Sequence, residues 1–152
     1  MSDIPFTTSA LAKRLVTAGL GTNADATRII QHYTSEGLLV PEGQVHTGTG
    51  KRRMYPASAF LKAAILFRLN RIGVPAGRIK ELVEGLDQHT REHHGAELEE
   101  ACRSLADPCL LLGIPDGPGG LRRVAQLVPA KKAYGTGDGD VIIIALNPYL
   151  KT

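Results

Sequence analysis

The chain has 152 residues, of which 43% are hydrophobic and 22% are charged, and its formal net charge is +3. This length accommodates one medium domain or two small ones, and the ordinary apolar content excludes a disordered chain and a membrane protein. The N-terminus lacks the basic and apolar regions of a secretory signal, and two cysteines are too few for a disulfide framework. We therefore expect a cytoplasmic protein with reduced thiols.

The charge is unevenly distributed along the chain. Residues 1–86 contain 11 lysines and arginines against 6 acidic residues, whereas residues 87–152 contain 7 against 9. A basic first part followed by an acidic second part suggests that only the first part meets a polyanion.

The first part is predicted to begin with two short helices. Apolar spacing predicts a helix over about 9–16 and a second, capped by Asn23 or Asp25, that runs to about Ser35 and stops at Gly37. Two short helices separated by a glycine-containing turn are typical of a helix-turn-helix.

A basic hairpin is predicted to follow the second helix. Val45–Thr47 and Arg52–Tyr55 flank a glycine-rich tip at residues 48–51. A third helix is expected between Ser58 and Gly73. A fourth is expected after Pro75, and its apolar spacing predicts a buried stripe. The stripe consists of Ile79, Leu82, Val83 and Leu86.

The sequence changes character after Leu86. Residues 87–106 are polar and predict a linker with one short helix over about 96–105. Three strands are then expected at Cys109–Ile114, Val124–Val128 and Val141–Leu146. The predicted fold is therefore α+β. A winged helix-turn-helix domain of about four helices and a β-hairpin wing (1–86) is followed by the polar helical linker (87–106) and a small β-rich module for dimerisation or effector binding (107–152).

The start of the second helix holds the residues expected to read DNA. Thr27, Arg28 and Gln31 are predicted to be exposed there, and the opening turns of such a helix reach base edges in the major groove. Arg28 can pair with guanine and Gln31 with adenine, because each offers two hydrogen-bonding points.

The hairpin tip supplies the expected phosphate contacts. Lys51, Arg52 and Arg53 lie at and beside glycines, which leave room for a close approach to the DNA backbone. We expect these contacts to contribute affinity that falls with salt.

The first part of the chain, residues 6–86, resembles the DNA-binding domain of MerR-type bacterial transcription regulators. The resemblance is carried by FTTSALAKRL, HYTSEGLLVP, the segment ending KRRMYP, and FRLNRIGVPAGRIKELVEGL, in that order. It implies that the second helix reads DNA and that Tyr33 and Arg53 contact phosphates. His32 and Tyr55 are added to the expected DNA-binding residues.

The family usually has arginine and an aromatic residue where this chain has Gln31 and His32, and it typically has a long dimerisation helix that is absent here. The resemblance also allows RNA polymerase, or another protein, as a partner.

Cysteines and histidines in the second part raise a weaker hypothesis of a metal site. The candidates are Cys102 with Cys109, and the His89 and His93 pair at helical i, i+4 spacing. Half-buried thiols and solvated histidines explain the same residues, so we expect no metal and no cofactor. No catalytic motif is present in the sequence, and an enzyme is not expected.

Together these observations predict a nucleoid-associated, sequence-specific protein that binds double-stranded DNA. We expect a bacterial transcriptional regulator that acts as a homodimer on a pseudo-palindromic site, because one short helix reads only a few base pairs. Three alternatives remain open: a DNA-bending factor for excision or recombination, a metal or ligand sensor, and a tail whose Val141–Leu146 strand pairs with another chain.

Overall fold

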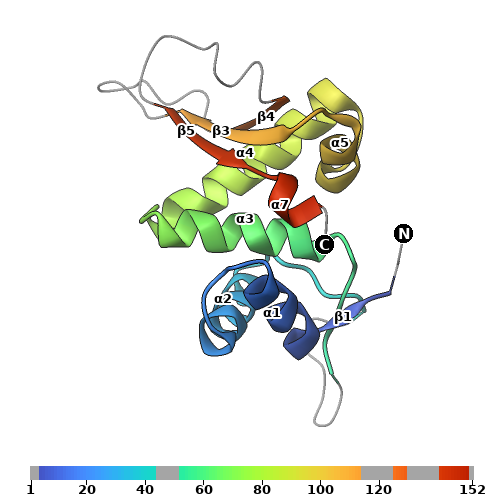
Figure 1. The fold of residues 1–152 in the computed structure, drawn as a ribbon, viewed down its shortest axis with the longest axis vertical. Helices are drawn as coiled ribbons and strands as arrows, with labels where there is room; N and C mark the ends of the chain where they lie inside the picture. The colour runs from blue at the N-terminus through green and yellow to red at the C-terminus, as the bar shows by residue number, and fades with distance from the viewer. Residues whose placement is uncertain (1–3, 44–51, 114–124, 130–140, 151–152) are drawn as a thin grey trace. The chain divides into compact units, whose positions relative to one another are not determined.

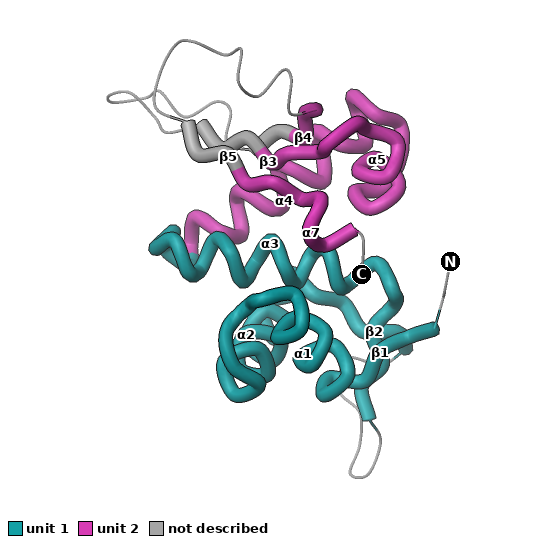
Figure 2. The backbone as a smooth tube through the Cα atoms, viewed as in Figure 1, with its two compact units in different colours: residues 1–76 teal, residues 77–152 magenta. Residues whose placement is uncertain are grey.

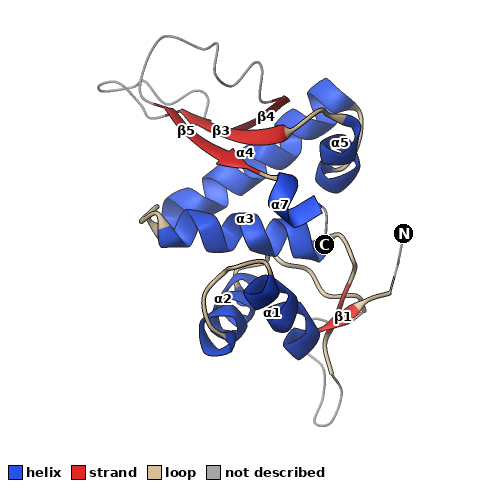
Figure 3. Ribbon diagram, in the orientation of Figure 1, coloured by secondary structure: helices blue, strands red, loops and turns tan. Residues whose placement is uncertain are grey.

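The computed structural model describes residues 4–43, 52–113, 125–129 and 141–150. Within these ranges the chain has an α+β fold of six helices and two small antiparallel sheets (Figures 1 and 3). It divides into two compact units, residues 1–76 and residues 77–152 (Figure 2).

The first unit begins with β1 (Phe6–Thr7), α1 (Thr8–Thr17) and α2 (Asn23–Ser35). Each helix starts at a threonine whose hydroxyl accepts a hydrogen bond from a backbone N–H three residues on: Thr7 caps α1 and Thr22 caps α2. Such caps satisfy N–H groups that have no partner inside the helix. The caps lie close to the predicted positions, so the two-helix prediction is confirmed.

The core of this unit is centred on α3 (Ala59–Arg71), which carries nine buried residues. The strand β2 (Met54–Tyr55) pairs antiparallel with β1, and Met54 also forms an isolated bridge with Glu42. These pairings hold the segment before α3 against the start of the chain. The helix predicted between Ser58 and Gly73 is confirmed.

In its described residues the second unit contains three helices and a three-stranded sheet in the order β4-β3-β5, both pairings being antiparallel. In chain order its elements are α4 (Ala76–His94), α5 (Leu98–Ser104), β3 (Pro108–Gly113), β4 (Ala125–Pro129), β5 (Val141–Ala145) and α7 (Asn147–Leu150). The three predicted strands are confirmed to within two residues.

The fourth helix continues into the segment predicted as a polar linker, residues 87–106, and ends at His94, and Gly95, with a φ of +63°, follows its end. The short helix predicted over about 96–105 is present as α5. The predicted apolar stripe is buried and extends to Thr90, whose hydroxyl donates to the Leu86 carbonyl at 2.7 Å. The sequence pattern did not predict this continuation, because Thr90 is the only buried residue in the last two turns of α4 and it is polar. The boundary between the two units falls at the start of α4, between Ala76 and Gly77.

No helix in the described ranges is long and apolar enough to cross a membrane. The predicted hairpin tip, with Val45–Thr47 and Lys51, lies outside the described residues, as do Ile114 and Val124.

Candidate nucleic-acid interface

The turn between α1 and α2 is fixed by two glycines. Gly19 and Gly21 have φ values of +85° and +65°, which residues with a side chain rarely adopt. A Cβ on Gly21 would also stand 2.6 Å from Cζ of Phe67. The close approach of the turn to α3 therefore requires glycine at this position.

The N-terminus of α2 is organised by Thr22. Its hydroxyl accepts from the Asp25 N–H at 3.2 Å and donates to the Asp25 carboxylate at 2.9 Å. Asp25 in turn lies 3.5 Å from Arg28, whose side chain is 76% exposed. An acidic residue in the first turn is stabilised by the helix dipole, and here it also restrains the arginine that follows.

The two sides of α2 differ sharply. One side buries Ala26, Ile29, Ile30, Tyr33 and Thr34. The predicted contact residues Arg28, Gln31 and His32 are exposed, and Thr27 is half-buried. Because helical residues three and four positions apart lie on the same face, as Thr27 and Gln31 or Arg28 and His32 do, these four form one polar strip along α2. We call Thr27, Arg28, Gln31 and His32 the α2 strip.

Tyr33 does not belong to this exposed strip. Its side chain is only 1% exposed, and among the described residues its hydroxyl has no hydrogen bond of standard geometry. Burial raises the pKa of its phenol, the Asn70 side chain opposes this in part, and Glu36 adds to the increase. A phosphate contact by Tyr33, as implied by the family resemblance, would require the surrounding core to repack.

Tyr55 is also a core residue here. It is fully buried, and its hydroxyl lies 2.7 Å from the Thr34 hydroxyl, which also lies 2.7 Å from the Ile30 carbonyl. Thr34 has one hydroxyl proton and donates it to Ile30, so Tyr55 must be the donor to Thr34. The expectation that Tyr55 contacts DNA needs correction, because this phenol instead joins β2 to α2.

The root of the predicted basic hairpin is closed by backbone bonding. The Glu42 N–H donates to the Met54 carbonyl at 2.7 Å, which brings the two ends of the intervening segment together. Arg52, just inside this root, is exposed, whereas Arg53 is half-buried and engaged in other interactions. Lys51 lies outside the described residues. We call the hydrogen bond from Tyr55 to Thr34 the clasp. Together with the bond from Glu42 to Met54, the clasp anchors the hairpin root to α2.

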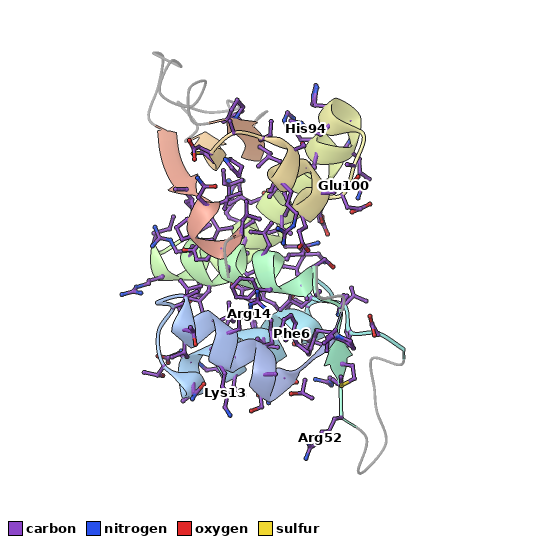
Figure 4. The ribbon with its side chains drawn as sticks, turned by 45° about the vertical axis from the view of Figure 1, so that its right-hand side comes forward. Phe6, Lys13, Arg14, Arg52, His94 and Glu100 are labelled. Atoms are coloured by element: carbon purple, nitrogen blue, oxygen red, sulfur yellow. The ribbon has the colours of Figure 1, made fainter. Side chains whose placement is uncertain are left out.

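Lys13 is a further exposed cation in the first unit that the sequence reading did not select. In Figure 4 its side chain and that of Arg52 both project from the side of this unit away from α3. The signal for Lys13 is its position on α1, outside the stripe formed by Leu11, Ala12 and Leu15. Arg14, its neighbour, instead stacks its guanidinium 5.3 Å from the Phe6 ring centre and 4.8 Å from that of Phe60.

The metal-site candidates are placed differently. Cys102 and Cys109 are both buried, and burial, followed by the Glu99 charge, raises the pKa of Cys102 to about 12. Burial also raises the pKa of Cys109. Both thiols are therefore protonated at neutral pH, and metals bind the thiolate.

His89 and His93 do come together on α4, with ring centres 4.2 Å apart, and His94 lies 6.1 Å from His89. Within the described ranges, however, no group of three or more histidine, cysteine or acidic side chains has an arrangement that could hold a metal ion. The histidines and cysteines do not form a joint site there.

Comparison with known proteins assigns no family. No protein-family model matches the chain, and no curated protein matches it. The functional argument therefore depends on the chain's own residues.

Proposed function

We propose that this protein binds double-stranded DNA through its first unit, with the α2 strip in the major groove and the basic hairpin predicted from the sequence against the phosphates. In this proposal it is a winged helix-turn-helix regulator of the MerR type that acts as a homodimer. The role proposed for it is bacterial transcriptional control.

The observation that carries the proposal is the polar α2 strip. Arg28 and Gln31 offer the two-point hydrogen-bonding groups that discriminate guanine and adenine. Both are exposed on a helix whose other side is anchored in the core and whose start is capped by Thr22. A rigid helix with such side chains on its open side matches what base readout requires.

Charge provides a second line of support. Lys13 and Arg52 are exposed on the same side of the unit, where they can attract phosphates. Arg28 is restrained by Asp25 at 3.5 Å in the free protein. Because both side chains are well exposed, this ion pair is weak and can give way to a guanine contact.

The decisive experiment compares two arginines of matched surroundings. Arg28 and Arg78 are both exposed, both near the start of a helix, and both paired with a carboxylate three residues away. Arg28→Ala should cost about 1–3 kcal/mol on the preferred duplex and relax the base preference at one position. Arg78→Ala removes the same charge from the other unit and should leave the base preference unchanged.

Arg52→Ala tests the phosphate contact separately. It should weaken binding to all duplexes alike and reduce the slope of log affinity against log salt by about 1. Equal losses of base preference for Arg28→Ala and Arg78→Ala would reject the assignment of α2 to the major groove. An unchanged salt slope for Arg52→Ala would reject the phosphate contact alone.

A further inference from the structure

The three-stranded sheet of the second unit has two outer edges, and hydrogen-bond geometry identifies which backbone groups face each of them. The Leu146 N–H donates to the Pro108 carbonyl at 3.0 Å, so the groups of Pro108 face the β5 side of β3. Facing direction alternates along an antiparallel ladder. Ile142 and Ile144 therefore bond to β3, whereas Val141, Ile143 and Ala145 direct their N–H and C=O groups away from it.

The outer edge of β4 is blocked. By the same alternation Gln126 and Val128 bond to β3, and Leu127 and Pro129 face outward. The outward carbonyl of Leu127 is 3.2 Å from Nε2 of His94, near the end of α4. Because a carbonyl only accepts, this nitrogen carries the proton. Pro129 has no N–H to offer. Both features hinder the addition of another strand.

The outer edge of β5 has no such protection among the described residues. Its five residues, Val-Ile-Ile-Ile-Ala, contain neither a charge nor a proline, although charged side chains and prolines are common means of protecting an edge. No described strand pairs with this side. The sheet thus has one blocked edge and one edge with outward-facing, strand-forming backbone.

We propose that the β5 edge pairs antiparallel with β5 of a second copy of this chain, about a two-fold axis at Ile143. Ile143 then faces its own counterpart, and Val141 faces Ala145 of the other copy. All three are outward-facing residues, so each of these pairs exchanges two backbone hydrogen bonds. The sheet continues across the axis as β4-β3-β5-β5-β3-β4.

The choice of a second copy as the occupant rests on the proposed function, which requires two DNA-binding units. It also has a local basis. Two copies of β5 carry no charged side chains, so they do not repel each other. In the register centred on Ile143, every residue whose backbone N–H and C=O groups face away from β3 lies opposite another such residue. A two-fold interface uses the same surface twice, which one strand edge satisfies.

The test is amide hydrogen exchange, followed residue by residue by NMR on the full chain without DNA, over a range of protein concentrations. Amides of Ile142 and Ile144 should be protected at every concentration. Amides of Ile143 and Ala145 should become protected only where sedimentation equilibrium shows a dimer. This alternation is specific to pairing at the β5 edge, and a dimer that leaves Ile143 and Ala145 exchanging would overturn the proposal.

A pair of proline variants provides a second test. Ile143→Pro removes an outward N–H from β5 and should weaken dimerisation about tenfold or more. Ala125→Pro removes an outward N–H from the blocked β4 edge and should leave dimerisation unchanged. A chain that stays monomeric at all concentrations would refute this interface. The outer edge of β5 would then be a candidate for pairing with a different protein. DNA binding is measured separately, so a dimer that binds no DNA would refute only the proposed function.

Discussion

Replacing Thr34 by valine should destabilise the first unit more than replacing Tyr55 by phenylalanine, although both changes break the same hydrogen bond. The difference follows from the direction of that bond. Tyr55 donates to Thr34, and Thr34 donates to the Ile30 carbonyl, with both distances at 2.7 Å. The bond joins β2, at the root of the predicted basic hairpin, to the helix proposed to read DNA.

The magnitudes follow from which polar group is left without a partner. In Tyr55→Phe the Thr34 hydroxyl keeps its bond to Ile30, so the cost is that of one net hydrogen bond, about 1 kcal/mol. In Thr34→Val the fully buried Tyr55 hydroxyl loses its acceptor. An unsatisfied buried group of this kind costs about 1–3 kcal/mol. The double variant removes both polar groups and should be more stable than Thr34→Val alone.

The measurement is urea unfolding of the four proteins in a double-mutant cycle, followed by far-UV circular dichroism. Hydrogen exchange of the Glu42 amide, which donates to Met54, reports on the hairpin root itself. Thr17→Val is the matched control, since its exposed hydroxyl makes the same i−4 bond, to Lys13, without a tyrosine partner. It should change stability by less than about 0.5 kcal/mol.

Two results would refute this reasoning. One is a double variant less stable than Thr34→Val, which would mean that the tyrosine hydroxyl has another acceptor. The other is a Thr17→Val variant that loses as much free energy of unfolding as Thr34→Val. That result would attribute the loss to replacing a helical threonine by valine and not to breaking the bond with Tyr55.

Three further results are expected. Thr22→Ala should lower the free energy of unfolding by about 1 kcal/mol by removing the α2 cap, as measured by urea unfolding; no change would mean that the cap is unimportant. In the native protein Cys102 should resist alkylation at pH 7, as detected by peptide mass spectrometry, because burial raises its pKa to about 12; rapid labelling without unfolding would contradict its burial. The pKa of His89 is lowered, first by burial and then by His93 and His94, so the unfolded chain binds the proton more readily. Stability should therefore fall as the pH decreases from about 6.5 towards the lowered pKa, and a His89→Gln variant with the same pH dependence would exclude this cause.

Much of the fold followed from local patterns. The apolar spacing of α1, α2 and α3 and the strand-forming runs of β3, β4 and β5 predicted these elements. The extent of α4 did not follow, since its last two turns are polar and bury only Thr90 in a stripe otherwise made of aliphatic residues. Thr90 shields its hydroxyl through a bond to a carbonyl of the same helix, which hydropathy cannot reveal.

The candidate site was predicted in part. Exposure of Arg28 and Gln31 was predicted from the position of these residues on the helix, whereas Thr27, also expected to be exposed, is half-buried. Helical periodicity places Tyr33 on the inner face of the helix, where it is buried. The burial of Tyr55 did not follow from the sequence, because a tyrosine can bury its ring and still present its hydroxyl at the surface. The clasp between Thr34 and Tyr55 joins residues 21 positions apart, so it depends on a contact between distant segments of the chain. The protection of the β4 edge by His94 depends in the same way on contacts between distant segments.

The most direct test of the central proposal is selection of bound duplexes from a random DNA library by the full-length protein, at low and at high salt. We expect enrichment of an inverted-repeat motif at both, with affinity falling steeply as salt increases. The absence of binding at either salt would contradict the assignment of a DNA-binding role to the first unit.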